Sequence, residues 1–355
     1  MDAARRIKGR GAVSNPQGRF ETWVRAAEDD GWWRETEEAD SPATRIHPET
    51  AAGAITRNDS PDIPFDRSVN PYQGCEHGCI YCYARPSHAY RGLSPGLDFE
   101  TQIYAKINIA ERLRQELAKP GYRPAPLCLG ANTDPWQPAE RHLRLTRQVL
   151  EVLAECRHPV TLVTKSALVE RDLDLLSALA RDGLVHAAIS LPTLDPDLAR
   201  HMEPRAAGPQ RRLATLERLA AAGIPVAVLV APVIPQLTDR DLERVLAAAA
   251  GAGARSAGYV LLRLPHEVKR LFADWLAAHY PLRAAHVMSL IRQTRDGQDY
   301  DPTFFTRQTG SGVHAGLIAR RFEVACRRHR LDVELPSLRS DLFRPPPPSG
   351  QLTLF

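Results

Sequence analysis

The sequence has no long apolar run: no stretch approaches the roughly eighteen consecutive apolar residues that a membrane-spanning helix needs. We therefore expect no membrane partner. Residues 1–11 are basic but contain no apolar segment of the kind found in secretory signals. This absence favours the cytoplasm, where thiols stay reduced, so the six cysteines are not expected to form disulfides.

A strong charge of either sign is also missing. The net charge is only +4 over 355 residues, a mild basic excess that permits a nucleic-acid partner but does not indicate one. A hydrophobic content of 43% is enough for a sizeable core. The chain therefore suits one large domain with appendages or two modest domains.

From about residue 66, short apolar runs alternate with apolar residues at helical spacing. The runs predict six strands, at Ser68–Gly74, Pro126–Ala131, Val160–Lys165, Val185–Leu191, Pro225–Ala231 and Ser256–Arg263. Repeated strand–helix units imply an α/β fold with a parallel sheet and right-handed crossovers. Six strands are fewer than the eight of a closed barrel, so an open doubly wound sheet and a partial, curved barrel both fit the pattern.

Other parts flank this repeating core, which we place at residues 61–265. Residues 1–60 are predicted to form an irregular N-terminal extension, because glycine, proline and acidic residues interrupt every apolar pattern there. A mostly helical extension is predicted over residues 266–343. Residues 344–355 form a proline-rich tail that ends in the peptide Gln351–Phe355, QLTLF.

Three cysteines, Cys75, Cys79 and Cys82, lie within one short segment with the spacing C-x3-C-x2-C. Thiolates are soft ligands that select zinc, copper(I) or iron–sulfur clusters. A cubane usually takes four cysteines, so three adjacent cysteines leave one iron open for a substrate or cofactor. The alternative is a zinc site completed by His77 or His88, although structural zinc sites usually include a second cysteine pair that this sequence lacks.

With the aromatic residue Tyr81 before its last cysteine, this segment resembles the signature of the radical S-adenosylmethionine (SAM) superfamily. The resemblance covers roughly residues 60–265 and implies a partial (β/α)6 barrel of the TIM type. It also implies a [4Fe–4S] cluster held by the three cysteines, SAM bound at its open iron, and an electron donor such as flavodoxin or ferredoxin. In this superfamily SAM is split to give a 5′-deoxyadenosyl radical, which abstracts a hydrogen atom from the substrate.

By the same resemblance, polar residues near the predicted strand ends are candidates for binding SAM. Thr133 and Asp134 follow the second strand, where family members bind the amino group of the methionine, although they also form a good helix start. Lys165 and Ser190, on the next two strands, suit the SAM carboxylate or ribose. For the charged candidates, solvation and surface ion pairs are the alternatives. The expected SAM contacts are Tyr81, Thr133, Asp134, Lys165, Ser190, Glu203 and Arg212.

The cysteine segment together with Asn132–Pro135 is most similar to the spore photoproduct lyase-like branch, whose members are described as DNA repair photolyases. This resemblance implies hydrogen abstraction from a nucleic-acid lesion. Spore photoproduct lyases carry a hydrogen-donating cysteine beside the polar motif, where this sequence reads Gly130-Ala131-Asn132. Cys128, slightly earlier, is the remaining candidate donor, so thymine-dimer reversal does not follow from the motif.

The C-terminal peptide resembles the short motif by which bacterial polymerases and repair proteins dock on the DNA sliding clamp. Leu352, Leu354 and Phe355 would fill an apolar groove while Gln351 makes hydrogen bonds. With this partner, DNA becomes the expected substrate. The alternatives are a radical SAM enzyme that acts on a peptide, RNA or metabolite, with the tail packed on its own domain, and a non-catalytic zinc-binding protein.

Overall fold

A computed structural model describes residues 6–21 and 42–347. Its centre is a seven-stranded sheet with the strand order β10-β9-β8-β7-β6-β3-β2. All neighbours are parallel except β2, which is antiparallel to β3. The strands of this sheet are β2 (Ile55–Arg57), β3 (Arg67–Val69), β6 (Leu127–Leu129), β7 (Val160–Thr164), β8 (Val185–Ser190), β9 (Val226–Val233) and β10 (Ser256–Leu261).

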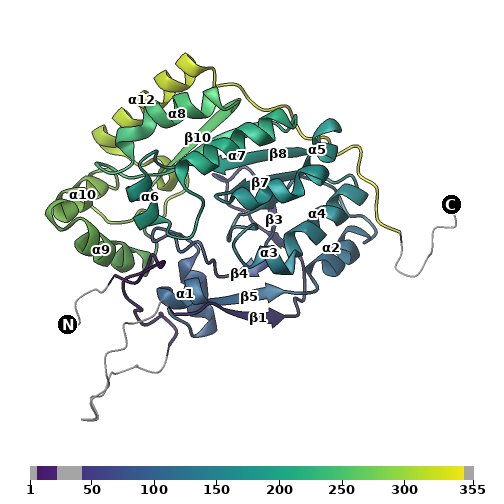
Figure 1. The fold of residues 1–355 in the computed structure, drawn as a ribbon, viewed down its shortest axis with the longest axis horizontal. Helices are drawn as coiled ribbons and strands as arrows, with labels where there is room; N and C mark the ends of the chain where they lie inside the picture. The colour runs from purple at the N-terminus through teal and green to yellow at the C-terminus, as the bar shows by residue number, and fades with distance from the viewer. Residues whose placement is uncertain (1–5, 22–41, 348–355) are drawn as a thin grey trace, which may run out of the picture.

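The parallel strands lie in the same order in the sheet and in the chain, as a singly wound barrel requires. The α/β fold and partial barrel expected from the sequence are confirmed, as an open sheet whose edge strands are β10 and β2. Helices follow the outside of this sheet, and Figure 1 shows α4, α7 and α8 along it. The helices between the strands are α2 (Ile109–Leu117), α3 (Glu140–Leu143), α4 (Leu145–Glu155), α5 (Leu173–Arg181), α6 (Pro196–Met202), α7 (Pro209–Ala221) and α8 (Leu242–Gly251), with 3-10 helices η1 (Arg85–Arg91), η2 (Ala167–Asp172) and η3 (Asp239–Asp241).

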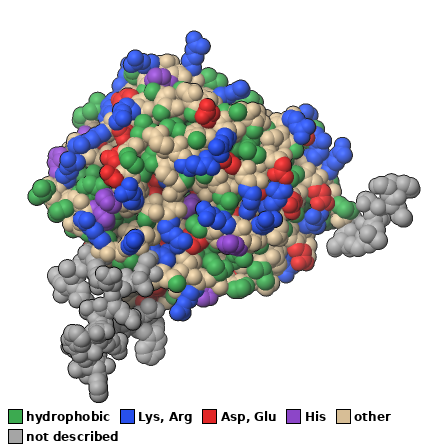
Figure 2. Space-filling view, viewed as in Figure 1, with side chains coloured by type: hydrophobic (Ala, Val, Ile, Leu, Met, Phe, Trp, Pro, Cys, Tyr) green, Lys and Arg blue, Asp and Glu red, His purple; other side chains and the backbone are tan. Residues whose placement is uncertain are grey.

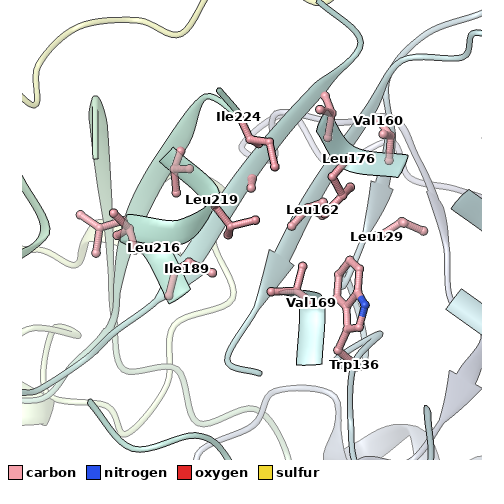
Figure 3. Packing of buried hydrophobic residues seen from close by; sticks show 14 of the residues in the cluster. Leu129, Trp136, Val160, Leu162, Val169, Leu176, Ile189, Leu216, Leu219 and Ile224 are labelled. Carbon is pink, nitrogen blue, oxygen red and sulfur yellow. The ribbon is translucent and has the colours of Figure 1, made fainter. Parts of the chain in front are cut away.

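The main hydrophobic core lies between the sheet and these helices. Figure 3 shows Leu162 and Ile189 of the strands beside Leu176 and Leu216 of the helices. Burial alternates along the strands, so that in β7 every second residue is fully buried and the residues between are half-buried. One face of the sheet therefore packs on helices, and the other faces the concave interior of the open barrel.

The first predicted strand, Ser68–Gly74, is wrong in detail. The chain forms β3 and then leaves the large sheet, because Pro71 has no N–H to continue the ladder. It enters a small sheet with the order β1-β5-β4, visible at the bottom of Figure 1. This sheet consists of β1 (Arg45–Glu49), β4 (Tyr72–Gln73) and β5 (Gln102–Lys106), and β5 directly follows α1 (Leu97–Thr101).

The N-terminal extension is less irregular than expected, because β1 and β2 both lie within residues 1–60 and pair with the core. The partner of β1, β5, is distant in sequence, so no local pattern indicates that pairing. The domain boundaries themselves stay predictions.

The C-terminal extension is mostly helical, as predicted, and ends in an extended segment. Residues 331–344 run across the N-terminal ends of the strands, where Arg339 N donates to Gly183 O (3.0 Å) and Arg344 N donates to Cys156 O (2.8 Å). This segment covers the end of the barrel opposite the carboxyl ends of the strands. The helices of the extension are α9 (Val268–His279), α10 (Pro281–Gln293), α11 (Thr306–Thr309) and α12 (Gly312–His329).

Among the described helices, none has the length and apolar character needed to cross a membrane. Figure 2 shows Lys and Arg side chains over much of the visible face, with Asp and Glu between them.

Candidate active site

The three clustered cysteines lie in one loop between β4 and η1. Gly74 (φ +82°) and Gly78 (φ +67°) adopt left-handed backbone that lets the loop fold back on itself. Gly78 N donates to Cys75 O (3.3 Å), and Cys82 N donates to Cys79 O (3.2 Å). Cys75 and Cys79 are buried and Cys82 is half-buried. The loop therefore curls around its own cysteines.

A buried arginine holds the shape of this loop. Arg85 donates to the carbonyl oxygens of Gly78 (3.0 Å) and Cys79 (2.8 Å). Its guanidinium also pairs with Glu100, which accepts a hydrogen bond from Gly11 N (3.0 Å). A Cβ added at Gly11 would lie 1.8 Å from Gly78 O, so the N-terminal segment packs directly on the cysteine loop and shields it from water.

Two segments that follow parallel strands, one after β6 and one after β8, hold the cysteine loop from its other side. After β6, the Gln137 side chain accepts from Glu76 N (2.9 Å) and donates to Gly74 O (3.2 Å). After β8, Met202 O accepts from Ile80 N (3.0 Å). These contacts place the cysteines at the carboxyl ends of the parallel strands, which is where such folds bind ligands.

Three of the expected SAM contacts form one buried network. Tyr81 Oη and Arg212 Nη2 donate to different oxygens of the Glu203 carboxylate. Arg212 also donates to Ser190 O (2.9 Å) and Ala207 O (2.7 Å). Burial and the Glu203 carboxylate raise the pKa of Tyr81 well above its usual value. Because these groups satisfy one another, they support the wall of the site and leave few donors free for SAM.

Two hydroxyl candidates are also engaged with the backbone. Ser190 Oγ donates to Ala231 O (3.3 Å), and Thr133 Oγ1 donates to Tyr72 O (3.1 Å). Both residues are buried. They lie at the carboxyl ends of β8 and β6, as predicted, but their present bonds fix loops.

Asp134 organises the turn after β6. Its carboxylate accepts from Thr164 Oγ1 (2.7 Å), Lys165 N (2.7 Å) and Trp136 N (3.0 Å). His77 Nδ1 lies 3.4 Å from the same carboxylate. Burial alone would raise the pKa of Asp134, but His77 and Lys165 lower it to about 2. These bonds fix a turn, whereas the helix start expected as the alternative role lies later, because α3 begins at Glu140 after Ala139; contact with SAM stays a prediction.

Lys165 differs from the other charged candidates. Its ammonium makes no hydrogen bond or ion pair with the described residues, although its backbone N–H binds Asp134. Burial disfavours the charged ammonium, yet the surrounding Cys79, Glu203 and Asp134 raise the pKa of Lys165 above its ordinary value. The site thus holds one positive charge that is available to an anionic ligand group.

The donor set fits an iron–sulfur cluster. Burial is the largest cause of the raised pKa of Cys75, and the Asp134 carboxylate and the thiols of Cys79 and Cys82 raise it further. Cys82 also packs in the same small cluster as Cys75. Burial raises the pKa of Cys79 to about 12, while Lys165 and Arg212 favour its thiolate. Within residues 6–21 and 42–347, no three His, Cys, Asp or Glu side chains converge on one metal ion. A cubane requires no such convergence, because each cysteine binds a different iron.

The two histidines of the zinc alternative are engaged elsewhere. His88 is buried, and its Nε2 lies 2.9 Å from Gln102 O. Burial lowers the pKa of His88 to about 4. His77 faces Asp134, so neither ring completes a site with the cysteines.

Cys128 lies in the middle of β6. Leu127 and Leu129 belong to the core beneath the helices, so the alternating Cys128 side chain points to the concave face. Burial raises the pKa of Cys128 to about 11. Burial of the Tyr83 hydroxyl and the thiols of Cys82 and Cys128 raise the pKa of Tyr83 to about 12. Tyr83 directly follows Cys82 in the chain, and its hydroxyl donates to Ala131 O, two residues after β6.

Sequence reasoning missed several residues of the site. Tyr83 is 49% exposed, and the Arg263 guanidinium lies 5.6 Å from its ring centroid. The one available signal was the position of Tyr83 directly after Cys82. Arg85 and Glu100 carry no periodic signal. The predicted clamp contacts Gln351, Leu352, Leu354 and Phe355 lie outside the described residues.

Comparison with known proteins identifies the family. The model of the radical SAM superfamily matches residues 69–249. An uncharacterised protein of Mycobacterium tuberculosis is 40% identical over 233 residues, which are 65% of this chain and 68% of the relative. An uncharacterised protein of Methanocaldococcus jannaschii is 25% identical over 171 residues, or 48% of this chain and 61% of the relative.

Among solved structures, a mutant of spore photoproduct lyase has a similar fold, with a TM-score of 0.54 and 16% identity over 80% of this chain and 78% of that chain. Fold, cysteine loop and family model agree on an enzyme that uses SAM-based radical chemistry. This chain belongs to the radical SAM superfamily. Members generally use a [4Fe–4S] cluster and SAM, and the three cysteines fit that cofactor.

Proposed function

We propose that this radical SAM enzyme acts on DNA, in repair or modification, with Cys75, Cys79 and Cys82 as ligands of its [4Fe–4S] cluster. Held by these three cysteines, such a cluster would supply, when reduced, the electron for splitting SAM into methionine and a 5′-deoxyadenosyl radical. The protein positions the reacting groups and excludes water. Arg85 and Glu100 perform the positioning, because together they fix the carbonyl groups of the cysteine loop.

Lys165 is the residue that we assign to the SAM carboxylate. It lies at the carboxyl end of β7, and although burial lowers the pKa of Lys165, the neighbouring Cys79, Glu203 and Asp134 raise it above its ordinary value, so the ammonium stays charged. A charged hydrogen bond to a carboxylate is stronger than a neutral one. The network of Tyr81, Glu203 and Arg212 would then hold the wall against which the nucleoside lies.

The observation that carries the DNA assignment is the exposure of Tyr83. This side chain follows a cluster ligand directly, yet its ring is half-exposed and lies under the cationic Arg263. An enzyme for a small metabolite would bury such a residue to exclude water. An exposed aromatic ring under an arginine instead suits a base of a large, polyanionic substrate. The fold shared with spore photoproduct lyase agrees with this assignment.

Two further partners belong to the proposal. The peptide Gln351–Phe355 would dock on the DNA sliding clamp and bring the enzyme to DNA. A flavodoxin or ferredoxin would reduce the cluster. The proposed location of this system is the cytoplasm.

The cofactor assignment is tested by anaerobic reconstitution with iron and sulfide. The wild-type protein should bind about four irons per chain, and with dithionite and SAM it should release 5′-deoxyadenosine. The Cys79→Ser variant should lose both properties. The Cys156→Ser variant is the control, because Cys156 is buried at the end of α4. A colourless wild-type protein with stoichiometric zinc would overturn the enzyme assignment in favour of a zinc-binding protein.

The substrate assignment is tested separately, by binding of the reconstituted protein to a DNA duplex at increasing salt concentration. Phosphate contacts release counterions, so affinity should fall steeply as salt rises. Damaged DNA and SAM labelled with deuterium at the 5′ carbon then test for hydrogen transfer. A reconstituted protein that cleaves SAM but does not bind DNA even at low salt would act on a peptide, RNA or metabolite instead.

A further inference from the structure

Two adjacent aromatic side chains are exposed between α10 and α12. Phe304 is 47% exposed and Phe305 is 62% exposed. Aromatic residues make up only 6% of the sequence. Burial of a large aromatic side chain usually stabilises the folded protein. An exposed pair in one turn is therefore unfavourable in the isolated protein unless something binds it.

The backbone at Phe305 is strained. Its φ of +67° and ψ of −56° are those of a γ-turn of the rarer, non-inverse form. Thr306 N donates to Phe304 O (2.9 Å), which is the hydrogen bond that defines such a turn. A bulky side chain seldom adopts positive φ, and strained residues of this kind concentrate at functional sites.

A buried ion pair holds this turn in place. Arg307 Nε donates to Asp62 Oδ2 (2.6 Å), and the same oxygen accepts from Phe305 N (3.1 Å). The Arg307 guanidinium also lies 4.7 Å from the ring centroid of Phe304. Asp62 belongs to the loop between β2 and β3, so the turn is attached to one edge of the open sheet.

The turn is attached to the other edge as well. The buried Arg295 donates to Thr306 O (2.8 Å) and to Leu262 O (2.8 Å), directly after β10. The next residue, Arg263, lies over Tyr83, and its Nη2 is 3.5 Å from Tyr300 Oη. The strained turn thus spans the gap between β10 and β2, and Arg263 connects the same region to Tyr83, the residue that follows Cys82.

We propose that Phe304 and Phe305 form a base-stacking element that holds an unpaired nucleotide of DNA at this open side of the barrel. The proposal rests on the proposed function, since it assumes that the substrate is DNA. A nucleobase offers a flat face to a phenyl ring whatever its sequence, and apolar side chains inserted between bases stabilise an unstacked nucleotide. The strained turn and the anchoring ion pair fix the backbone that carries both rings. Little conformational entropy would therefore be lost when a base binds.

The test compares a duplex that carries one mismatched, unpaired base with a fully paired duplex, by fluorescence anisotropy with the reconstituted protein. The wild-type protein should prefer the mismatched duplex. Phe305→Gly removes the ring and relieves the positive φ, so its melting temperature should not fall. Its affinity for the mismatched duplex should drop by roughly 5- to 100-fold, the range for loss of one base–aromatic contact, with a smaller drop for the paired duplex.

Two further variants complete the test. Phe305→Tyr keeps a ring and should keep the preference for the mismatched duplex. Leu282→Ala removes an apolar side chain that is 99% exposed on α10 and should change neither affinity. Unchanged preference in both Phe305→Gly and a Phe304→Ala variant would overturn the base-stacking role alone. Wild-type protein that binds neither duplex would overturn the DNA assignment, and the inference with it.

Discussion

The Arg85 guanidinium and the Glu100 carboxylate form an ion pair 2.5 Å long in which neither side chain has any exposed surface. The pair connects the cysteine loop to the N-terminal segment. Arg85 binds the carbonyl groups of the cysteine loop, while Glu100 accepts hydrogen bonds from the backbone N–H groups of Gly11 and Ala12. Loss of either partner would leave a buried charge unpaired beside the cysteine loop.

The first prediction concerns this ion pair. Glu100→Gln should lower the free energy of unfolding by about 3–5 kcal/mol, the usual effect of removing one partner of a buried pair. It should also lower the iron content after reconstitution, because the cysteine loop loses its support. Guanidinium unfolding and iron analysis under anaerobic conditions measure both effects.

The matched control is Glu155→Gln, which removes the partner of Arg114 in an ion pair of the same length, 2.5 Å, with both side chains substantially exposed. An exposed pair contributes less than about 1 kcal/mol. Equal losses of stability in the two variants would show that burial of the Arg85–Glu100 pair has no special effect.

The repeating core was predictable because its signals are local. The apolar run Val160–Lys165 became β7, Val160–Thr164, and Val185–Leu191 became β8, Val185–Ser190. Each run differs in hydropathy from its flanking helices, and polar residues or a proline follow it. The cysteine spacing is equally local, so the position of the site followed from the sequence.

The connections within the site were not predictable, because their partners are distant in sequence. Tyr81 and Glu203 are separated by 122 residues, and Asp62 and Arg307 by 245. Residue type also failed to separate ligand-binding groups from supporting ones: Arg212 is a plausible SAM contact by sequence, yet the fold buries it against Glu203. Only tertiary structure distinguishes the two roles.

A second prediction concerns the dependence of stability on pH. His158 is fully buried before β7, with Nε2 2.9 Å from Tyr122 Oη and its ring against Phe343. Burial lowers the pKa of His158 from 6.5 to about 4. Between pH 6.5 and pH 4, His158 is therefore protonated in the unfolded chain and neutral in the folded chain. The contribution of the buried neutral imidazole to stability is complete above pH 6.5 and is lost as the pH falls towards 4.

Protonation of His158 in the unfolded chain should lower the free energy of unfolding of the wild-type protein by about 2 kcal/mol between pH 7 and pH 5. His158→Gln keeps a polar side chain that does not titrate, so the difference in unfolding free energy between the two proteins should shrink by this amount as the pH falls. His88 and His279 also have lowered pKa values, but they are present in both proteins and cancel in the comparison. A difference that stays constant with pH would contradict the prediction.

A third prediction concerns Lys165. Lys165→Gln should weaken SAM binding by about 10- to 100-fold, the effect of losing one hydrogen bond between charged groups in a partly buried site. The iron content should stay unchanged, because the cysteines keep their positions. Anaerobic equilibrium dialysis with labelled SAM measures the affinity, and Lys165→Arg, which retains the charge, should recover part of it. Equal affinity of wild type and Lys165→Gln would remove Lys165 from the SAM site.

The last prediction concerns the C-terminal peptide. Deletion of Gln351–Phe355 should abolish binding to a bacterial sliding clamp in a pulldown, while SAM cleavage by the reconstituted enzyme continues at the wild-type rate. The two activities should separate because the extended segment 331–344 crosses the N-terminal ends of the strands, whereas the cysteines lie at the carboxyl ends. Because a short peptide loses entropy when it becomes ordered on its partner, the affinity should be modest.

Leu354→Ala together with Phe355→Ala removes the groove-filling groups without shortening the chain and should have the same effect as the deletion. Clamp binding that survives in both variants would show that another surface of the protein, not this peptide, binds the clamp.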